Sequence, residues 1–300
     1  MPQDAALPLR SWLFAPGDKG RVMEKACASE ADAVILDLED AVALSEKPRA
    51  RAEVAAFVQA YPRANLYVRI NALGTPFAFE DVAAVAAVRP GGVMLPKAES
   101  AFEIRLLDWL LAQHERQAGA PEGAIAVVPL IESAAGVAAA REIAQASTRV
   151  RCLAFGAGDY TLDLGLTWSR DETELHPARA EIVLASRIAG LEPPVDAVWV
   201  QIGDADGMDA SALRARDHGF QGKLCIHPTQ VTAVHRAYAP APAEVDKARR
   251  ILEAFAAAES SGVAAIQVDG KMVDYPVVAA ARRTVADAAR AAARGAAPSA

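Results

Sequence analysis

Two stretches of the sequence decide the fold, Pro129-Leu-Ile-Glu-Ser133 and Phe155-Gly-Ala-Gly-Asp-Tyr160. Each follows a short apolar run of β type, places a carboxylate where such a strand would end, and precedes a helical pattern. Buried apolar runs that alternate with helices indicate parallel strands. Because chemistry collects at the carboxyl ends of parallel strands, we expect Glu132 and Asp159 to lie at neighbouring strand ends.

The same alternation extends over most of the chain. Eight strand-like runs, each followed by a helical stretch, occupy about 230 residues, which matches an α/β fold of the (β/α)8 TIM barrel type. The predicted strands are residues 11–16, 33–40, 65–71, 92–97, 125–128, 152–155, 196–202 and 222–228.

Polar and ionisable residues recur directly after these apolar runs. Randomly placed surface charges would not recur at the same position after each run, so the pattern predicts a charged active site at one mouth of the barrel. The groups at the strand ends are Pro16-Gly17, Asp37, Glu39, Asp40, Arg69, Asn71, Lys97, Glu132, Asp159, Asp204 and His227. His227 is more typical of a hydrogen-bonded structural histidine than of a base.

The alternation of strands and helices ends in the last part of the chain. Tyr238-Ala-Pro-Ala-Pro-Ala243 is typical of a linker, and helices are predicted over about 244–260 and 277–294. We therefore predict a barrel domain over residues 1–237, which holds the metal and substrate site, and a C-terminal helical extension over 238–300. The extension could act as a lid over the active site or as an oligomerisation arm.

The composition excludes several classes of protein. The 300 residues carry a net charge of −7 and no basic stripe, which argues against a nucleic-acid partner. No uncharged apolar run is long enough for a membrane span, and the N-terminus does not look like a signal peptide. Cys27, Cys152 and Cys225 lack metal-ligand spacing and are typical of reduced thiols. These features predict a cytoplasmic protein.

Two carboxylates at adjacent strand ends can share one hard cation. Mg²⁺ is the natural choice, because it binds through one or two carboxylates and leaves its other positions to water or substrate oxygens. The alternative is that Glu132 and Asp159 are helix N-caps or surface charges. Taken singly, each residue favours that alternative, whereas the pair within the strand repeat favours a metal.

Eight short motifs occur in a fixed order along nearly the whole chain. They are Arg10–Asp18, Ile35–Val42, Val68–Asn71, Leu95–Lys97, Pro129–Ser133, Gly156–Tyr160, Ile226–Pro228 and Gly270–Asp274. Through them the chain resembles the citrate lyase β-subunit-like group of the HpcH/HpaI aldolase superfamily, which includes malyl-CoA and citramalyl-CoA lyases.

The resemblance implies a TIM barrel that binds Mg²⁺ through Glu132 and Asp159. It implies that Arg69 contacts the reacting carbonyl or enolate oxygen. It also implies a homotrimer or hexamer in which the tail of one subunit covers a neighbouring barrel and supplies Asp274 as the catalytic acid/base. From spacing alone, Asp274 would instead cap the helix that follows Pro276.

The tail favours the CoA-lyase branch, because shorter relatives lack it. We therefore expect a lyase that cleaves or forms a 3-hydroxyacyl-CoA, such as malyl-CoA or citramalyl-CoA, with acetyl-CoA and glyoxylate or pyruvate as the other reactants. Alternatives are a citrate lyase β subunit, which uses an acyl-carrier-protein thioester and which the tail argues against, and a catalytically silent acyl-CoA-binding barrel. Departures from the family pattern at Gly158, Gln201 and Gly203 favour the silent barrel.

Further residues are assigned from their positions at the barrel mouth. Strand alternation points Asp37 and Glu39 to one side and Asp40 to the other, so the first two could hold metal-bound waters or Arg69, or form a structural network. Lys97 could bind the substrate carboxylate. The basic residues near the first helix, Lys19, Arg21 and Lys25, could receive the phosphates of coenzyme A, or form a solvated face.

Overall fold

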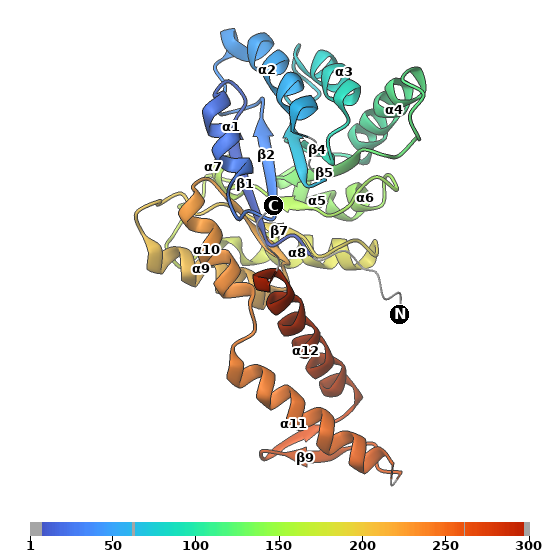
Figure 1. Cartoon of the computed structure of the whole chain (residues 1–300), viewed down its shortest axis with the longest axis vertical. Helices are drawn as coiled ribbons and strands as arrows, with labels where there is room; N and C mark the ends of the chain where they lie inside the picture. The colour runs from blue at the N-terminus through green and yellow to red at the C-terminus, as the bar shows by residue number, and fades with distance from the viewer. Residues whose placement is uncertain (1–7, 62–63, 261, 297–300) are drawn as a thin grey trace. The chain divides into compact units, whose positions relative to one another are not determined.

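A closed ring of eight parallel strands, taken in chain order, forms the centre of the molecule. The computed structural model describes residues 8–61, 64–260 and 262–296 (Figure 1). Helices surround the ring, so the predicted (β/α)8 barrel is confirmed, with a helical extension after it. The barrel strands are β1 (Ser11–Pro16), β2 (Ala33–Asp37), β3 (Leu66–Arg69), β4 (Gly92–Leu95), β5 (Ala126–Ile131), β6 (Ala154–Phe155), β7 (Val195–Asp196) and β8 (Gly222–Cys225).

A helical segment follows each barrel strand, as predicted, and two short 3₁₀ turns, η1 (Leu44–Glu46) and η2 (Thr173–Leu175), precede α2 and α8. The barrel helices are α1 (Gly20–Cys27), α2 (Lys47–Ala60), α3 (Ala78–Val88), α4 (Ala101–Gln117), α5 (Ala134–Ala138), α6 (Ala140–Ala144), α7 (Ala157–Asp163), α8 (His176–Ile188), α9 (Ala205–His218) and α10 (Pro228–Tyr238). In the described part of the chain, no helix combines the length and the apolar character that a membrane crossing requires.

The seventh strand is much shorter than predicted. Residues 196–202 were expected to form it, but the ladder ends at Asp196. Its neighbour β6 offers Ala154 alone as a partner, because β6 ends at Phe155 and α7 begins at Ala157. Trp199 is nevertheless 3% exposed, and its carbonyl accepts a hydrogen bond from Gln230 Nε2 at 2.8 Å. The apolar residues that suggested a longer strand are therefore partly buried without strand pairing, as at Trp199, and partly exposed, as at Val200 and Ile202.

Side chains that alternate along the strands fill the interior of the barrel. Trp12 and Tyr67 pack near its amino-terminal end with ring centroids 4.6 Å apart, and the Tyr67 hydroxyl accepts a hydrogen bond from Arg151. This cluster consists of Leu9, Trp12, Ala33, Ile35, Tyr67, Met94, Val128, Leu130, Cys152, Ala154, Val195 and Leu224. The same alternation turns the side chains of Asp37, Arg69 and Glu132 inward at the opposite end.

A cluster of fully buried charges ties β7 and β8 to the outer helices. Asp196 accepts hydrogen bonds from Arg179 Nε at 2.9 Å and from Lys223 Nζ at 2.6 Å. Glu172 accepts from Arg179 Nη2 at 3.0 Å and from Ser211 Oγ at 2.9 Å. Burial alone would raise the pKa of Asp196, but the two cations lower it from 3.8 to about 2. The ionised form of Asp196 is therefore the stable one in the folded protein.

This lowered pKa predicts an acid-dependent loss of stability. Since the folded protein holds Asp196 ionised at pH values where the unfolded chain protonates it, its contribution is present above pH 4 and is lost as the pH falls toward 2. We expect an Asp196→Asn variant to be less stable than the parent at pH 6. The gap should shrink by about 2 kcal/mol between pH 5 and pH 2 in urea titrations. A gap that is independent of pH would contradict the assignment.

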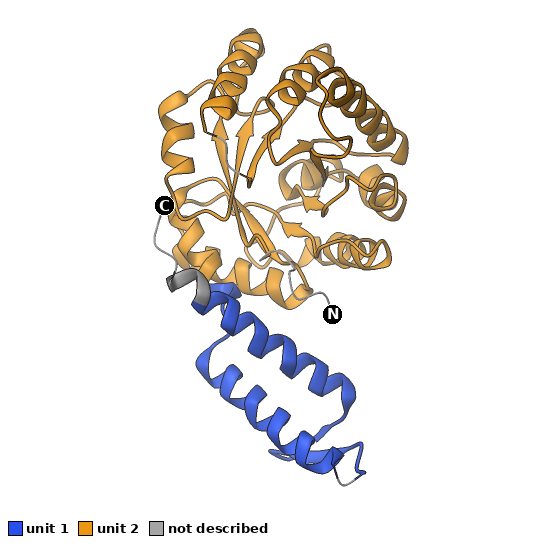
Figure 2. Cartoon of the chain, turned by 45° about the vertical axis from the view of Figure 1, so that its right-hand side comes forward, with its two compact units in different colours: residues 1–7, 236–300 blue, residues 8–235 orange. Residues whose placement is uncertain are grey.

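The chain forms two compact units, coloured separately in Figure 2. One unit is Pro8–His235, and the described residues of the other are 236–260 and 262–296. This second unit consists of α11 (Pro242–Glu259), an antiparallel hairpin and α12 (Tyr275–Ala296), in chain order. The hairpin is formed by β9 (Ile266–Val268) and β10 (Lys271–Val273). Ala248, Ile251, Phe255, Val273, Val278 and Ala281 form its own apolar core.

The hairpin was missed in the sequence. Asp269 and Gly270 form its two-residue loop, with φ of 51° and 76°. Two consecutive residues with positive φ are the mark of a type I′ turn, for which an Asp-Gly pair between short apolar runs is the usual signal. The apolar core of this unit and the Asp-Gly turn together account for the order of the extension.

Candidate active site

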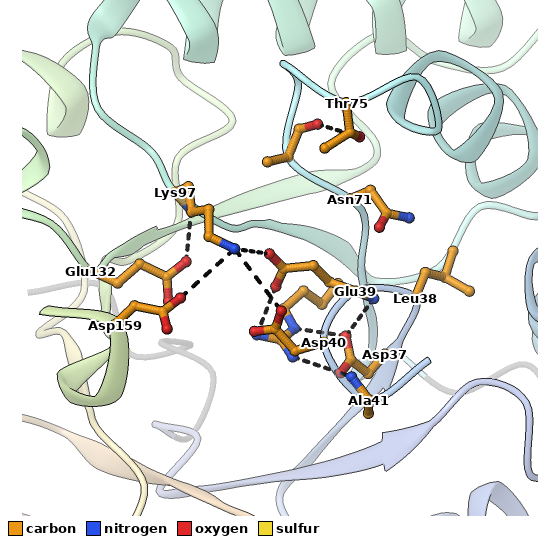
Figure 3. Close-up of polar contacts among 12 residues, drawn as sticks. Asp37, Leu38, Glu39, Asp40, Ala41, Asn71, Thr75, Lys97, Glu132 and Asp159 are labelled. Carbon is orange, nitrogen blue, oxygen red and sulfur yellow. Dashed lines mark hydrogen bonds and ion pairs between the residues drawn. The ribbon is translucent and has the colours of Figure 1, made fainter. Parts of the chain in front are cut away.

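The ionisable residues at the carboxyl ends of β2 to β6 lie together at one mouth of the barrel. Figure 3 shows Lys97 between the carboxylates of Glu132 and Asp159 on one side and those of Glu39 and Asp40 on the other. Each of these residues lies at the end of its strand or within the next four residues, and Asp159 is already in the first turn of α7. Because the parallel strands of the barrel all end at the same mouth, residues that follow different strands meet there although they are distant in the sequence.

Glu132 is a buried carboxylate held in one orientation. It directly follows β5, is 5% exposed, and its Oε1 accepts the backbone N–H of Lys97 at 2.7 Å. Its Oε2 lies against Gly156, where an added Cβ would sit 2.5 Å away. Burial, together with the negative charges of Glu39 and Asp159, raises the pKa of Glu132 to about 8. A nearby cation would reverse that shift.

Asp159 lies in the first turn of α7, directly after β6, and is more exposed than Glu132. Its carboxylate lies beside that of Glu132 in Figure 3, and its Oδ2 is 3.8 Å from Lys97 Nζ. The two acids therefore face a common space. Neither side chain caps a helix through a hydrogen bond found in the described residues, so the alternative of two N-caps has no support.

Arg69, at the end of β3, is fixed by a bidentate ion pair with Asp37, at 2.7 Å from Nε and 2.6 Å from Nη2. Asp37 itself accepts the backbone N–H groups of Glu39 and Ala41. The remaining nitrogen, Nη1, is 3.0 Å from Glu39 Oε2. Burial alone would lower the pKa of Arg69, but Asp37 and Glu39 raise it, so the guanidinium stays charged. The ring of Phe14 lies 4.9 Å from it.

The prediction from strand alternation is wrong for Asp40. Because β2 ends at Asp37, the pleat does not continue through the next three residues. Asp40 Oδ2 lies 3.7 Å from Arg69 Nη1, and its Oδ1 lies 4.0 Å from Lys97 Nζ. Asp40 therefore faces the same cations as Glu39.

Lys97 has an unusual backbone conformation, with φ of 50°. This left-handed region costs a non-glycine residue about 1 kcal/mol. In this conformation the backbone N–H of Lys97 reaches Glu132, while its Nζ donates to Glu39 Oε1 at 2.6 Å. Partial burial lowers the pKa of Lys97, but the hydrogen bond to Glu39 and the nearby carboxylates raise it on balance. The ammonium therefore remains protonated at neutral pH.

The charge balance and the donor chemistry of the mouth suit a divalent metal. Five carboxylates (Asp37, Glu39, Asp40, Glu132 and Asp159) face two cations (Arg69 and Lys97), an excess of three negative charges when all are ionised. Over the described ranges of the chain, no group of three or more histidine, cysteine or acidic side chains is arranged as a full metal cage. Two carboxylates with open positions are the arrangement that Mg²⁺ uses when substrate oxygens complete its shell.

The other predicted site residues lie outside this group. Lys19, Arg21 and Lys25 are all exposed. Lys19 directly precedes α1, at the same end of the barrel as the acids, whereas Lys25 lies in the last turn of that helix. Asp274 belongs to the second unit, where its Oδ1 accepts the backbone N–H of Val277 at 3.3 Å. This contact is the helix cap that the spacing of the sequence predicted for Asp274 as an alternative to a catalytic role.

The three departures from the family pattern do not disturb the carboxylate pair. A Cβ added at Gly158 would come no closer than 3.8 Å to another side chain, that of Trp168, and one added at Gly203 would meet nothing within 4 Å. Gln201 is exposed. A side chain would therefore have room at Gly158 and at Gly203.

Gly156 is the functional position that the sequence analysis passed over, and a substitution there gives a direct test. Because a Cβ would overlap Glu132, we expect Gly156→Ala to displace that carboxylate and weaken Mg²⁺ binding about tenfold, as measured by calorimetry. The matched control is Gly158→Ala, two residues further on in the first turn of α7, where a methyl group has room. Equal affinities in the two variants would show that the orientation of Glu132 does not matter.

The family model for HpcH/HpaI aldolase/citrate lyase matches residues 10–228, which is most of the barrel unit. The chain belongs to this family. The resemblance stated from the motifs is therefore confirmed, and it places the chain among lyases.

Relatives of two kinds match over almost the full length. The citrate lyase subunit beta of Leuconostoc mesenteroides is 37% identical, with 92% of each chain covered. The L-malyl-CoA/beta-methylmalyl-CoA lyase of Cereibacter sphaeroides is 35% identical, with 91% of this chain and 92% of the relative covered. Among solved structures, the CitE protein of Mycobacterium tuberculosis, in complex with magnesium, acetoacetate and coenzyme A, aligns with a TM-score of 0.78 at 35% identity, over 94% of this chain and 98% of that one.

These matches correct one inference from the sequence. The tail was expected to favour CoA lyases over citrate lyase β subunits. A citrate lyase β subunit covers 92% of this chain, and residues 1–237 of the 300 could supply only 79%. The match must therefore reach into the extension, so possession of a tail does not separate the two branches.

Proposed function

We propose that the chain is a Mg²⁺-dependent carbon–carbon lyase that cleaves or forms a 3-hydroxyacyl-CoA, such as malyl-CoA or citramalyl-CoA. The products of cleavage would be acetyl-CoA and a 2-oxo acid, glyoxylate or pyruvate. The observation that carries the proposal is the carboxylate pair Glu132 and Asp159 beside the fixed guanidinium of Arg69. Support comes from the malyl-CoA lyase relatives and from the magnesium, acetoacetate and coenzyme A bound by the CitE protein.

Glu132 and Asp159 would hold the metal. When bound, Mg²⁺ would polarise the carbonyl of a 2-oxo acid and orient its carboxylate. Glu132 is ready for this role because the backbone of Lys97 and the lack of a side chain at Gly156 fix its orientation. The excess of negative charge at the mouth also favours a divalent cation over a neutral ligand.

Arg69 would stabilise the oxyanion. In cleavage, a carboxylate of the mouth would take the proton of the substrate hydroxyl, and the alkoxide would become the carbonyl of the 2-oxo acid as the carbon–carbon bond breaks. The electron pair of that bond would form the enolate of the acyl thioester, which then takes a proton on carbon. Asp37 occupies Nε and Nη2 of Arg69, so Nη1, which is 3.0 Å from Glu39 Oε2, is the nitrogen that would turn to a developing negative oxygen. A guanidinium held in advance does not need to reorganise during the reaction.

We propose Asp274 as the acid that protonates the enolate, and as the base in the reverse direction. A carboxylate can do this when closure of the site excludes water and brings it within hydrogen-bond reach of the carbon acid. Asp274 would be delivered by the tail of a neighbouring subunit in a homotrimer or hexamer. The exposed basic residues Lys19 and Arg21, at the same end of the barrel as the acids, would receive the coenzyme A phosphates, and Lys25 would have the weaker part.

A second candidate is a citrate lyase β subunit that acts on an acyl-carrier-protein thioester. The observation that favours it is the near full-length match to citrate lyase β subunits from several bacteria, at 35% to 38% identity. The barrel chemistry would be the same, and only the carrier of the acyl group would differ.

The purified chain with MgCl₂ should test both candidates. We expect it to release acetyl-CoA from malyl-CoA or citramalyl-CoA, and EDTA should stop the reaction. The reverse reaction would detect the second candidate: condensation of an acetylated acyl carrier protein with oxaloacetate, measured as formation of the citryl thioester. Absence of turnover on every substrate, with binding of coenzyme A retained, would favour the catalytically silent barrel.

A further inference from the structure

The ammonium group of Lys97 occupies a central position among the acids of the mouth. Its Nζ is 2.6 Å from Glu39 Oε1, 3.8 Å from Asp159 Oδ2 and 4.0 Å from Asp40 Oδ1. Figure 3 shows it between the two groups of carboxylates. One of the two metal-binding acids of the proposed site therefore already has a positive charge beside it.

The backbone keeps this charge close to the metal ligands. The N–H of Lys97 donates to Glu132 Oε1, and the left-handed conformation at Lys97 lets the same residue reach Glu132 with its main chain and Glu39 with its side chain. The side chain is half-exposed, so the ammonium can still turn toward a ligand that enters the mouth.

We propose that Lys97 is a positioning residue that couples metal binding to binding of the 2-oxo acid. The inference rests on the proposed metal site. An ammonium 3.8 Å from Asp159 repels a divalent cation on that carboxylate, so Lys97 weakens metal binding to the free enzyme. When the carboxylate of a 2-oxo acid enters, Lys97 can donate to it, and the repulsion becomes attraction. By linkage, the metal and the acid then strengthen each other's binding.

The simpler reading is that Lys97 only neutralises the buried Glu39. The two readings predict opposite effects when the charge is removed. If Lys97 neutralises Glu39 alone, its loss disturbs the site and metal binding weakens or stays unchanged. If Lys97 opposes the metal, its loss strengthens metal binding to the free enzyme and weakens binding of the acid.

Calorimetric titration of the full chain with MgCl₂ at pH 8.5, with and without saturating sodium pyruvate, distinguishes them. Lys97→Met keeps the length of the side chain and loses its charge, whereas Lys97→Arg keeps the charge. We expect Lys97→Met to bind Mg²⁺ alone about tenfold more tightly than the parent. The factor by which pyruvate strengthens Mg²⁺ binding should be about tenfold smaller in Lys97→Met than in the parent. Lys97→Arg should stay within about threefold of the parent on both measures.

Equal or weaker Mg²⁺ binding by Lys97→Met, in a parent that binds Mg²⁺ normally, would overturn this inference alone. A parent that binds no Mg²⁺ under either condition would overturn the proposed lyase site as well. Circular dichroism establishes that each variant is folded. If Lys97→Met does not fold, Lys97→Gln is uncharged and retains a donor for Glu39, and the same affinities are expected of it.

Discussion

Replacement of Glu132 by glutamine should reduce kcat/KM by about 10³-fold or more, because the proposed metal would lose one of its two protein ligands. The same change should stabilise the metal-free protein. Glutamine can still accept the backbone N–H of Lys97 and fits the space beside Gly156, but it never places a charge in this buried position. The two effects in opposite directions are typical of a residue selected for function rather than stability.

The sign of the stability effect follows from the pKa of Glu132, which burial raises from 4.5 to about 8. Between these values the folded protein holds a proton that the unfolded chain has released, so this group destabilises the fold increasingly as the pH rises from 4.5 to 8. The advantage of glutamine should approach about 5 kcal/mol above pH 8 and should vanish below pH 4.5.

Thermal unfolding in EDTA at pH 8.5 and at pH 4.5, together with calorimetry with MgCl₂, would measure these effects. Glu142→Gln, at an exposed position on α6, is the matched control and should change neither activity nor stability. A Glu132→Gln variant that keeps a tenth of the parent's activity, or that melts below the parent in EDTA at pH 8.5, would show that Glu132 does not have the role proposed here.

Replacement of Arg69 by lysine should reduce kcat by about 10²-fold with a smaller change in KM. Arginine satisfies Asp37 with two nitrogens and still presents Nη1 to the mouth of the barrel, 3.0 Å from Glu39 Oε2. A single ammonium cannot keep the ion pair with Asp37 and also meet a developing oxyanion in the same geometry. Because the positive charge is retained beside Asp37, we expect the fold to survive.

Steady-state kinetics of the lyase reaction would measure this effect, with Arg49→Lys as the control. Arg49 lies on α2 and pairs with Glu46 at the exposed surface, so the same exchange there should leave kcat unchanged. If Arg69→Lys raised KM while kcat stayed constant, Arg69 would bind the substrate rather than stabilise the transition state.

The sequence was most informative where the physical signal is local and periodic. The alternation of strands and helices predicted the barrel, because strands buried on both faces must be apolar and each must be followed by a covering helix. It predicted β7 least well, because the burial of Ala197 and Trp199 looks the same in sequence whether or not their backbone has a partner strand.

By itself, the sequence determined the order of the elements, the family motifs, and the concentration of acids and cations at strand ends, since each of these is set within a few neighbouring residues. Only the tertiary structure decided the geometry of the site. It placed Gly156 against Glu132, turned Asp40 toward Arg69, and put the ammonium of Lys97 between two groups of carboxylates. These are contacts between residues far apart in the chain, and their distances and burial arise from closure of the barrel.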